Sequence, residues 1–136
     1  MNLGDFQEIE PIYNLEFDDF WKPQNLKSEL QNVSSKYIVA KENGEIVGFA
    51  GIWYSVDDAH ITNIVVRKSY RNKGIGSILL EKLIELAKTK TSLTLEVNTK
   101  NEIAQKLYLK YGFKNLGIRK KYYDGIEDAY IMTLYF

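Results

Sequence analysis

Cysteine is absent from this 136-residue sequence, and histidine occurs only once, at His60. The lack of cysteine excludes disulfides, thiolate metal sites and a cysteine nucleophile. A single histidine disfavours a histidine-based zinc site and a Ser-His-Asp triad, so we expect no bound metal. Eighteen basic residues balance eighteen acidic ones. Proteins dedicated to nucleic acid usually carry a basic excess, so we expect no direct contact with nucleic acid.

Long apolar runs and a targeting segment are also lacking. The first residues, MNLGDFQEIEP, show no basic start followed by an apolar core, so no signal peptide is predicted. The longest apolar runs have the length of strands, far below a membrane span. We therefore expect a cytoplasmic protein without membrane contact. Its length suits one domain over residues 1–136 and is too short for two ordinary ones.

Proline is scarce, and both prolines lie in the first quarter of the chain, at Pro11 and Pro23. The apolar spacing there predicts an irregular helix disturbed by Pro11. A second short helix is expected to have Pro23 near its first turn, where proline is tolerated.

From residue 36 onward, strand-like and helix-like segments alternate. Two hairpin signals, Asn43-Gly44 and Asp124-Gly125, each stand between strand-like runs. Apolar spacing predicts three strands, a helix, a strand, a helix capped by Asn101, and two strands. The apolar stripe of that last helix is expected to hold Ile103, Leu107 and Tyr111. This order predicts an α/β fold whose sheet mixes parallel and antiparallel strands, with helices on both faces.

The segment RNKGIGS, residues 71–77, places two glycines before an amphipathic helix. A helix N-terminus offers unpaired N–H groups and the positive end of the helix dipole to a phosphate. The segment is not a Walker loop, because Lys73 precedes the first glycine. A Rossmann turn needs a third glycine, and position 79 is leucine. Alone, the two glycines are equally typical of a tight turn between a strand and a helix.

Together with its surroundings, this loop resembles the acetyl-CoA-binding core of the GCN5-related N-acetyltransferases, the GNAT family. The family pattern, Arg/Gln-x-x-Gly-x-Gly/Ala after a strand, is matched by Arg71, Gly74 and Gly76. The segments LEVNTKNEIAQKLYLKYGF and GIRKKYYDGIEDAYIM are similar to the family's next strand and helix and to its closing hairpin. Together these features resemble the RimI-type branch. The resemblance implies a single-domain acyl-CoA N-acyltransferase fold, with acetyl-CoA as the co-substrate.

The resemblance also implies which residues hold acetyl-CoA. The pantetheine arm would lie between two splayed parallel strands, bound by backbone groups of Ile64, Val65 and Val66. Asn101 would reach the CoA arm from the start of the later helix. The pyrophosphate would lie against the glycine loop, with charge from Arg71 and Lys73, surrounded by Asn72, Lys73, Gly74, Ile75, Gly76 and Ser77.

Two side chains are candidates for proton transfer. Glu96 lies on the less apolar face of its strand, and the resemblance places the general base there. From spacing alone, an ordinary solvent-facing glutamate is the alternative. Tyr108 is the candidate general acid toward the departing thiolate, because the ordinary pKa of a phenol is about 10. Its alternative is core packing. A backbone N–H of Val65 or Val66 is the candidate donor to the thioester oxygen.

The acceptor implied by the resemblance is the N-terminal α-amine, an alanine, of a small-subunit ribosomal protein. Acidic and aromatic side chains suit such a cationic peptide end, although a solvated turn or core packing explains each of them equally well. These candidates are Trp21, Tyr122, Tyr123, Asp124, Glu127 and Asp128. The sequence departs from the RimI-type pattern at Asn98, where arginine is common, and at Lys100, where a small serine is common. Both departures bear on the peptide preference.

Two alternatives remain open at this point. The same fold could acetylate a polyamine or an internal lysine, or it could bind CoA without turnover. An α-amine with a pKa of about 8 is roughly one-tenth neutral at pH 7, whereas a lysine with a pKa of about 10.4 is almost wholly charged. A modest base such as Glu96 therefore suffices for an N-terminus. We expect a monomer or a weak dimer.

Overall fold

The computed structural model describes residues 1–17, 23–123 and 127–136 and, for residues 14 and 121–123, the backbone only. Its first elements are helical: α1 (Leu3–Ile9), η1 (Glu10–Ile12), α2 (Tyr13–Glu16) and α3 (Pro23–Glu29). Asn2 and Asp5 form a capping box that starts α1. Pro11 lies in η1, where the chain leaves the regular α-helix because proline lacks an N–H group. The predicted irregular helix and the helix that begins at Pro23 are confirmed.

A six-stranded sheet forms the centre of the fold, in the order β1-β2-β3-β4-β6-β5. β3 and β4 run parallel, and the other neighbouring strands run antiparallel, as predicted for a mixed sheet. The strands are β1 (Ser35–Glu42), β2 (Glu45–Tyr54), β3 (Asp58–Val66), β4 (Ser92–Asn98), β5 (Lys114–Tyr123) and β6 (Glu127–Tyr135).

The first hairpin turns at Asn43-Gly44, as the sequence predicts. The φ angles are 52° at Asn43 and 81° at Gly44. Two successive positive φ angles are required by the tight turn that matches the twist of antiparallel strands, and Asn-Gly adopts them at low cost. The turn sets the register of β1 against β2, so β2 lies inside the sheet, between β1 and β3.

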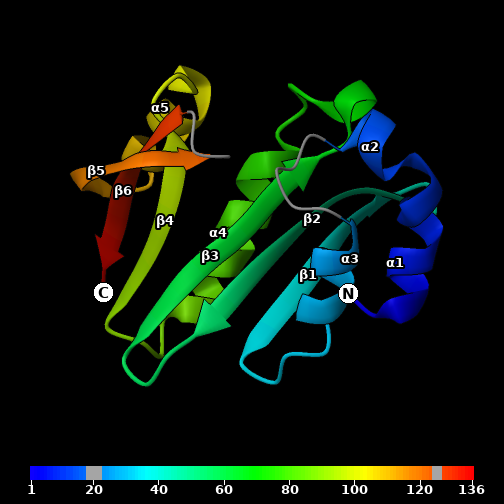
Figure 1. Ribbon diagram of the computed structural model, residues 1–136, viewed down its shortest axis with the longest axis horizontal. Coiled ribbons are helices and arrows are strands. Elements are labelled where there is room, and N and C mark those ends of the chain that lie inside the picture. Colours follow the sequence, from blue (N-terminus) through cyan, green and yellow to red (C-terminus); the bar gives the residue numbers. More distant parts are fainter. Residues whose placement is uncertain (18–22, 124–126) are drawn as a thin grey trace.

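Helices cover both faces of the sheet, and each face has its own core. On one face, α4 (Ile75–Ala87) and α5 (Glu102–Lys110) pack against β2, β3 and β4. The opposite face is covered by α1, α2 and α3, with Phe6, Tyr13 and Phe49 buried between them and the sheet. Figure 1 shows α4 behind the sheet and α1 and α3 in front of β1 and β2. The predicted fold class is confirmed.

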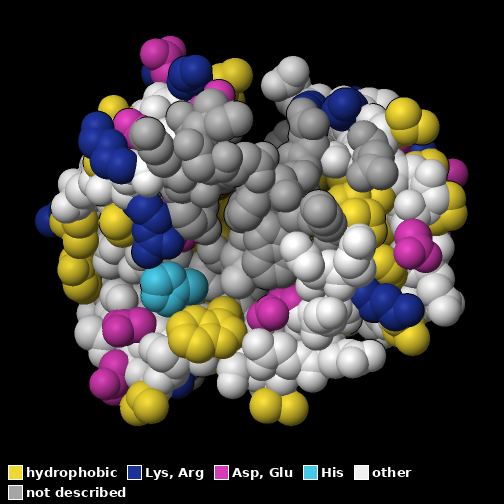
Figure 2. All heavy atoms as spheres, viewed as in Figure 1, with side chains coloured by type: hydrophobic (Ala, Val, Ile, Leu, Met, Phe, Trp, Pro, Cys, Tyr) yellow, Lys and Arg dark blue, Asp and Glu magenta, His cyan; other side chains and the backbone are white. Residues whose placement is uncertain are grey.

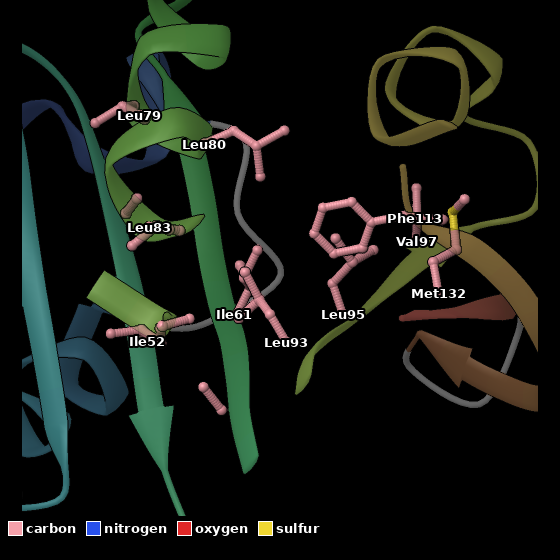
Figure 3. Close-up of a cluster of buried hydrophobic side chains, with 13 residues drawn as sticks. Ile52, Ile61, Leu79, Leu80, Leu83, Leu93, Leu95, Val97, Phe113 and Met132 are labelled. Carbon is pink, nitrogen blue, oxygen red and sulfur yellow. The ribbon is translucent and has the colours of Figure 1, made fainter. Parts of the chain in front are cut away.

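The core on the α4 face connects the two halves of the sheet. In Figure 3, leucines of α4 stand on one side, Ile61 and Leu95 lie in the middle, and Phe113 and Met132 close the other side. Leu95 and Val97 are buried, as the alternation in β4 predicts. Burial of apolar surface therefore holds the β1-β2-β3 and β4-β6-β5 halves together below the point where they separate.

The two parallel strands separate partway along their length. β3 pairs with β4 only from Asp58 to His60, against Ser92 to Thr94. Figure 1 shows β3 and β4 close together at one end and diverging toward α5. The splayed parallel pair implied by the family resemblance is therefore present. In the described part of the chain, no helix is long and apolar enough to cross a membrane.

Candidate active site

A cleft of about 720 Å³ opens where β3 and β4 separate. One wall is the end of β3 and the loop that leads into α4, and the other wall is α5. Figure 2 shows the outline of the molecule notched at this edge. The lining residues are Ile64, Val65, Val66, Tyr70, Arg71, Asn72, Gly74, Ile75, Gly76, Ser77, Asn101, Ile103, Ala104, Lys106, Leu107, Tyr108 and Lys110. The structure thus brings together every candidate acetyl-CoA residue except Lys73.

The glycine loop presents the start of α4 to the cleft. Gly74 is the N-cap of α4, with a φ of 82°, and as a glycine it has no side chain to cap the first turn. Asn72 also has a positive φ, 64°. A Cβ added at Gly76 would meet only Val66, at 3.8 Å. The first N–H groups of α4 are therefore left for an anion in the cleft, at the positive end of the helix dipole.

The cations of the loop are held by neighbouring groups. The Arg71 Nε donates to the carbonyl oxygen of Val66 at 3.1 Å. The Lys73 ammonium lies over the ring of Tyr70, 5.1 Å from its centroid, and Lys73 does not line the cleft. The residues on either side of Lys73 line the cleft, whereas its ammonium group lies over the ring of Tyr70, outside the cleft lining.

Tyr108 projects from α5 into the cleft. Its ring packs 5.8 Å from that of Phe113, between centroids. Burial raises the pKa of Tyr108 to about 12, because a phenolate loses hydration in apolar surroundings. The side chain is therefore both a packed aromatic residue and a protonated hydrogen-bond donor at the cleft.

Glu96 lies on the opposite face of β4 from Leu95 and Val97, as predicted, and does not line the cleft. Its side chain is 14% exposed and forms an ion pair with Arg119 of β5 at 3.6 Å. The sequence does not predict this partner, because β5 and β4 are not adjacent in the sheet and Arg119 reaches Glu96 over the intervening strand β6. Arg119 is thus a missed neighbour of the candidate base.

The closing hairpin brings the two departures from the RimI-type pattern together. Asn98 donates a hydrogen bond to Glu127, and Lys100 lies 3.5 Å from the same carboxylate. The hydrogen bond from Asn98, and then the charge of Lys100, lower the pKa of Glu127. Asp128 pairs with Lys120 at 3.4 Å. Trp21 and Asp124, and the side chains of Tyr122 and Tyr123, lie outside the described residues.

Several cleft residues were not predicted, and they share one stripe of α5. Ile103, Lys106, Leu107 and Lys110 follow the i, i+3, i+4, i+7 spacing of a helix face. Ile103 was predicted on the apolar stripe of this helix, and it lies there beside Leu107, but its side chain is 80% exposed at the cleft wall instead of buried in the core. Helical spacing identifies a face without showing whether it meets the core or a ligand.

Comparison with known protein families shows which family this chain belongs to. The model of the acetyltransferase (GNAT) family matches residues 6–113, which include the glycine loop and all of α5. The chain belongs to the GNAT family. This GNAT chain is also similar to RimI-type enzymes over most of its length, as the sequence resemblance indicated. A Bacillus subtilis relative named for [ribosomal protein bS18]-alanine N-acetyltransferase activity is 40% identical over 133 residues, covering 93% of this chain and 88% of the relative.

Solved structures agree with this placement. The crystal structure of the ribosomal-protein-S18-alanine N-acetyltransferase from Escherichia coli superposes with a TM-score of 0.88 and 31% identity, covering 99% of this chain and 90% of that one. A GNAT acetyltransferase from Elizabethkingia anophelis with acetyl-CoA bound has a TM-score of 0.74 and 28% identity, with 85% of this chain and 84% of that chain covered. The chain is therefore an N-acetyltransferase of a family that uses acetyl-CoA.

The residues of the cleft fit acetyl-CoA. The uncapped first turn of α4 and the open space around Gly74 and Gly76 suit a pyrophosphate. Beyond Thr94, no residue of β4 pairs with β3, so the backbone of β3 around Val65 is not covered by a neighbouring strand on that side. It can therefore bind a pantetheine arm.

Proposed function

We propose that this GNAT enzyme acetylates the N-terminal α-amine of a protein that begins with alanine, and that this acceptor is a small-subunit ribosomal protein of the S18 type. The observation that carries the proposal is the cleft itself, in which the loop before α4 and Tyr108 of α5 face each other. The names of the relatives in B. subtilis and E. coli support the choice of acceptor. A ribosomal acceptor also implies that the reaction takes place in the cytoplasm.

The donor is acetyl-CoA, held by the cleft. Its pyrophosphate lies against the loop residues Asn72 to Ser77, and its pantetheine arm lies along Ile64, Val65 and Val66, within reach of Asn101. Bound there, it supplies an acetyl thioester. A backbone N–H of Val65 or Val66 donates to the thioester oxygen as that oxygen gains charge. Removing a donor of this kind costs about 2.7–4 kcal/mol in other enzymes.

Donor and acceptor reach the reaction centre from opposite faces of the sheet. The cleft and Tyr108 belong to the face that carries α4 and α5. Glu96 points to the other face, away from Leu95 and Val97. Because β3 and β4 separate beyond His60 and Thr94, the gap between them connects the two faces of the sheet. An amine beside Glu96 can therefore reach a thioester held in the cleft. We assign the acceptor side to the Glu96 face for this reason.

Glu96 is the proposed general base. Its carboxylate takes a proton from the acceptor ammonium, directly or through water, and the neutral nitrogen then attacks the carbonyl carbon of the acetyl group. The N–C bond forms and the C–S bond breaks, with the electron pair of the broken bond staying on sulfur. The nitrogen then releases its remaining excess proton to water, which leaves a neutral amide. Arg119 forms an ion pair with Glu96 at 3.6 Å, which holds the carboxylate in place on this face of the sheet.

Tyr108 is the proposed donor to the departing sulfur. With a pKa of about 12, its phenol keeps its proton at neutral pH. A free thiol has a pKa of about 8.5, so complete proton transfer to a solvated thiolate would be uphill. Tyr108 therefore acts first as a hydrogen-bond donor that stabilises charge on sulfur. The proton follows as the apolar cleft makes the thiolate more basic.

A panel of acceptors tests the proposal. The protein is incubated with acetyl-CoA and peptides with a free N-terminal alanine, including one that copies the start of ribosomal protein S18. The same peptides with a blocked N-terminus and an internal lysine, and polyamines, are assayed in parallel. Thiol release and a mass gain of about 42 Da, from an acetyl group that replaces a hydrogen atom, should occur only with free N-termini. Release with polyamines alone would contradict the proposal.

A pair of substitutions separates catalysis from folding. Glu96→Gln keeps the shape of the side chain and should lower turnover by about 10²- to 10⁴-fold while acetyl-CoA still binds. Glu102→Gln, at the exposed start of α5, removes a carboxylate of the same type and should leave turnover unchanged.

A further inference from the structure

Two lysines of α5 line the cleft and have no role in the proposal above. Lys106 and Lys110 lie one helical turn apart, on the stripe that also holds Ile103 and Leu107. Both lysines are exposed. Their ammonium groups therefore stand at the solvent edge of the wall that faces the glycine loop.

Neither ammonium is neutralised within the described part of the protein. Surface lysines elsewhere form ion pairs, such as Lys82 with Glu85 at 3.8 Å and Lys120 with Asp128 at 3.4 Å. No carboxylate of the described residues lies within 4.0 Å of the ammonium of Lys106 or Lys110. Two cations one turn apart repel each other, so an anion between them would relieve a local imbalance of charge.

The cations of the glycine loop are less suited to a second anionic group. Arg71 is tied to the Val66 carbonyl through its Nε, and Lys73 lies on the ring of Tyr70 outside the cleft lining. The uncapped N–H groups of α4 suit a pyrophosphate, which carries charge close to the backbone. CoA also carries a phosphomonoester on its ribose, the 3′-phosphate, which is a strongly hydrated dianion.

We propose that Lys106 and Lys110 form the binding site for the 3′-phosphate of CoA, so that the enzyme distinguishes acetyl-CoA from acetyl-dephospho-CoA. This assignment rests on the proposed function, because it takes the cleft to be the donor site. Two flexible ammonium groups at a solvent edge suit a phosphomonoester that remains partly hydrated. The pyrophosphate then binds to the opposite wall of the cleft, at the glycine loop and the start of α4.

Binding of CoA and of dephospho-CoA to the full-length protein tests the site directly, by calorimetry at low salt. Wild-type protein should bind CoA about tenfold more tightly than dephospho-CoA, a difference of about 1.4 kcal/mol. Lys106→Gln/Lys110→Gln should remove this preference while leaving the affinity for dephospho-CoA unchanged. Lys106→Arg/Lys110→Arg retains the two positive charges and should keep most of the preference for CoA. A purely structural role of the lysines would not predict this result.

Lys88→Gln is the matched control, since Lys88 is an exposed lysine at the far end of α4 from the glycine loop. It should leave both affinities unchanged. Equal binding of CoA and dephospho-CoA by the wild type would overturn the inference. A loss of affinity for both ligands in Lys106→Gln/Lys110→Gln would also overturn it, because the lysines would then bind the pyrophosphate that both ligands carry. Failure of the wild type to bind either ligand would instead contradict the proposed function.

Discussion

Gly76 has no Cβ at the point where the first turn of α4 meets the cleft. Its φ lies outside the positive range, and a Cβ there would meet only Val66 at 3.8 Å. The fold therefore does not require glycine at this position. Gly74 differs, because its φ of 82° strains any other residue. Substitution of Gly76 can thus separate ligand binding from folding.

Gly76→Glu should fold normally, because a carboxylate in the first turn is favoured by the helix dipole. It should weaken acetyl-CoA binding by at least about 100-fold, since like charges brought together cost several kcal/mol. Gly76→Ala should bind acetyl-CoA as the wild type does and be more stable by up to 1 kcal/mol or so, roughly the helix preference of alanine over glycine. Thermal unfolding and calorimetry check both variants, and normal binding by Gly76→Glu would refute the pyrophosphate site.

Tyr108 packs and donates at once, so removing only its hydroxyl separates the two roles. Tyr108→Phe keeps the ring contact with Phe113. We expect a loss of turnover of about 10²- to 10⁴-fold, with acetyl-CoA affinity changed by less than about threefold. Single-turnover kinetics and calorimetry measure the two quantities. Equal turnover in the variant would remove the assigned role.

The raised pKa of Tyr108 makes a further prediction about stability. The folded-state pKa of about 12 lies above the ordinary value of 10.0. The protonated phenol therefore contributes stability that is fully present below pH 10 and is lost as the pH rises through 12. Urea unfolding of wild type should show a larger decrease from pH 9 to pH 11 than that of Tyr108→Phe. The same decrease in both proteins would contradict the raised pKa.

At the scale of elements, α4 and α5 are joined by Tyr111, the C-cap of α5. Its hydroxyl donates to a carboxylate oxygen of Glu81 at 2.5 Å. The hydrogen bond with Glu81 raises the pKa of Tyr111, and Ser77, which lines the cleft, interacts with the same hydroxyl. This link ties the wall that carries Tyr108 to the first turns of α4.

Tyr111→Phe should therefore weaken acetyl-CoA binding by about three- to tenfold, the usual value of one hydrogen bond, with little effect on turnover at saturation. Tyr54→Phe is the matched control, because Tyr54 donates to Leu86 near the other end of the same helix, at 3.4 Å. It should bind acetyl-CoA normally. An equal loss of affinity in both variants would indicate a general loosening of α4 rather than a specific link.

At the scale of the whole molecule, two halves of one sheet are joined by a short parallel ladder and by a shared apolar core. A ligand that contacts both walls of the cleft binds the folded state only. At 100 times its dissociation constant, it stabilises that state by about 2.7 kcal/mol. We expect acetyl-CoA to raise the Tm of wild type by roughly 5–10 °C and to leave that of Gly76→Glu unchanged. Scanning calorimetry provides the measurement, and an unchanged wild-type Tm would contradict binding in the cleft.

Charges of both signs are also distributed over the whole molecule. On the face shown in Figure 2, Lys and Arg side chains alternate with Asp and Glu among the described residues. Ion pairs such as Arg119 with Glu96 and Lys100 with Glu127 contribute to this pattern. The acceptor is therefore expected to be recognised by individual side chains of β4 and the closing hairpin rather than by a broad field of one sign.

The sequence by itself determined the order of the elements, the Asn43-Gly44 turn, the Asn101 cap and the glycine loop. Each of these depends on residues a few positions apart: the Asn101 side chain, for example, accepts from the N–H of Ala104 at 3.1 Å. Such local patterns are readable because backbone geometry sets them directly. The family resemblance rests on the same local segments.

The tertiary structure alone decided which side chains meet. Arg119 reaches Glu96, and Glu127 reaches Asn98, because the sheet order places β6 between β4 and β5. The pKa of Tyr108 depends on burial beside Phe113, and the exposure of Ile103 depends on the separation of β3 from β4. These relations arise from packing between segments distant in sequence, and neither periodicity nor spacing encodes which face of a helix or strand will meet a ligand.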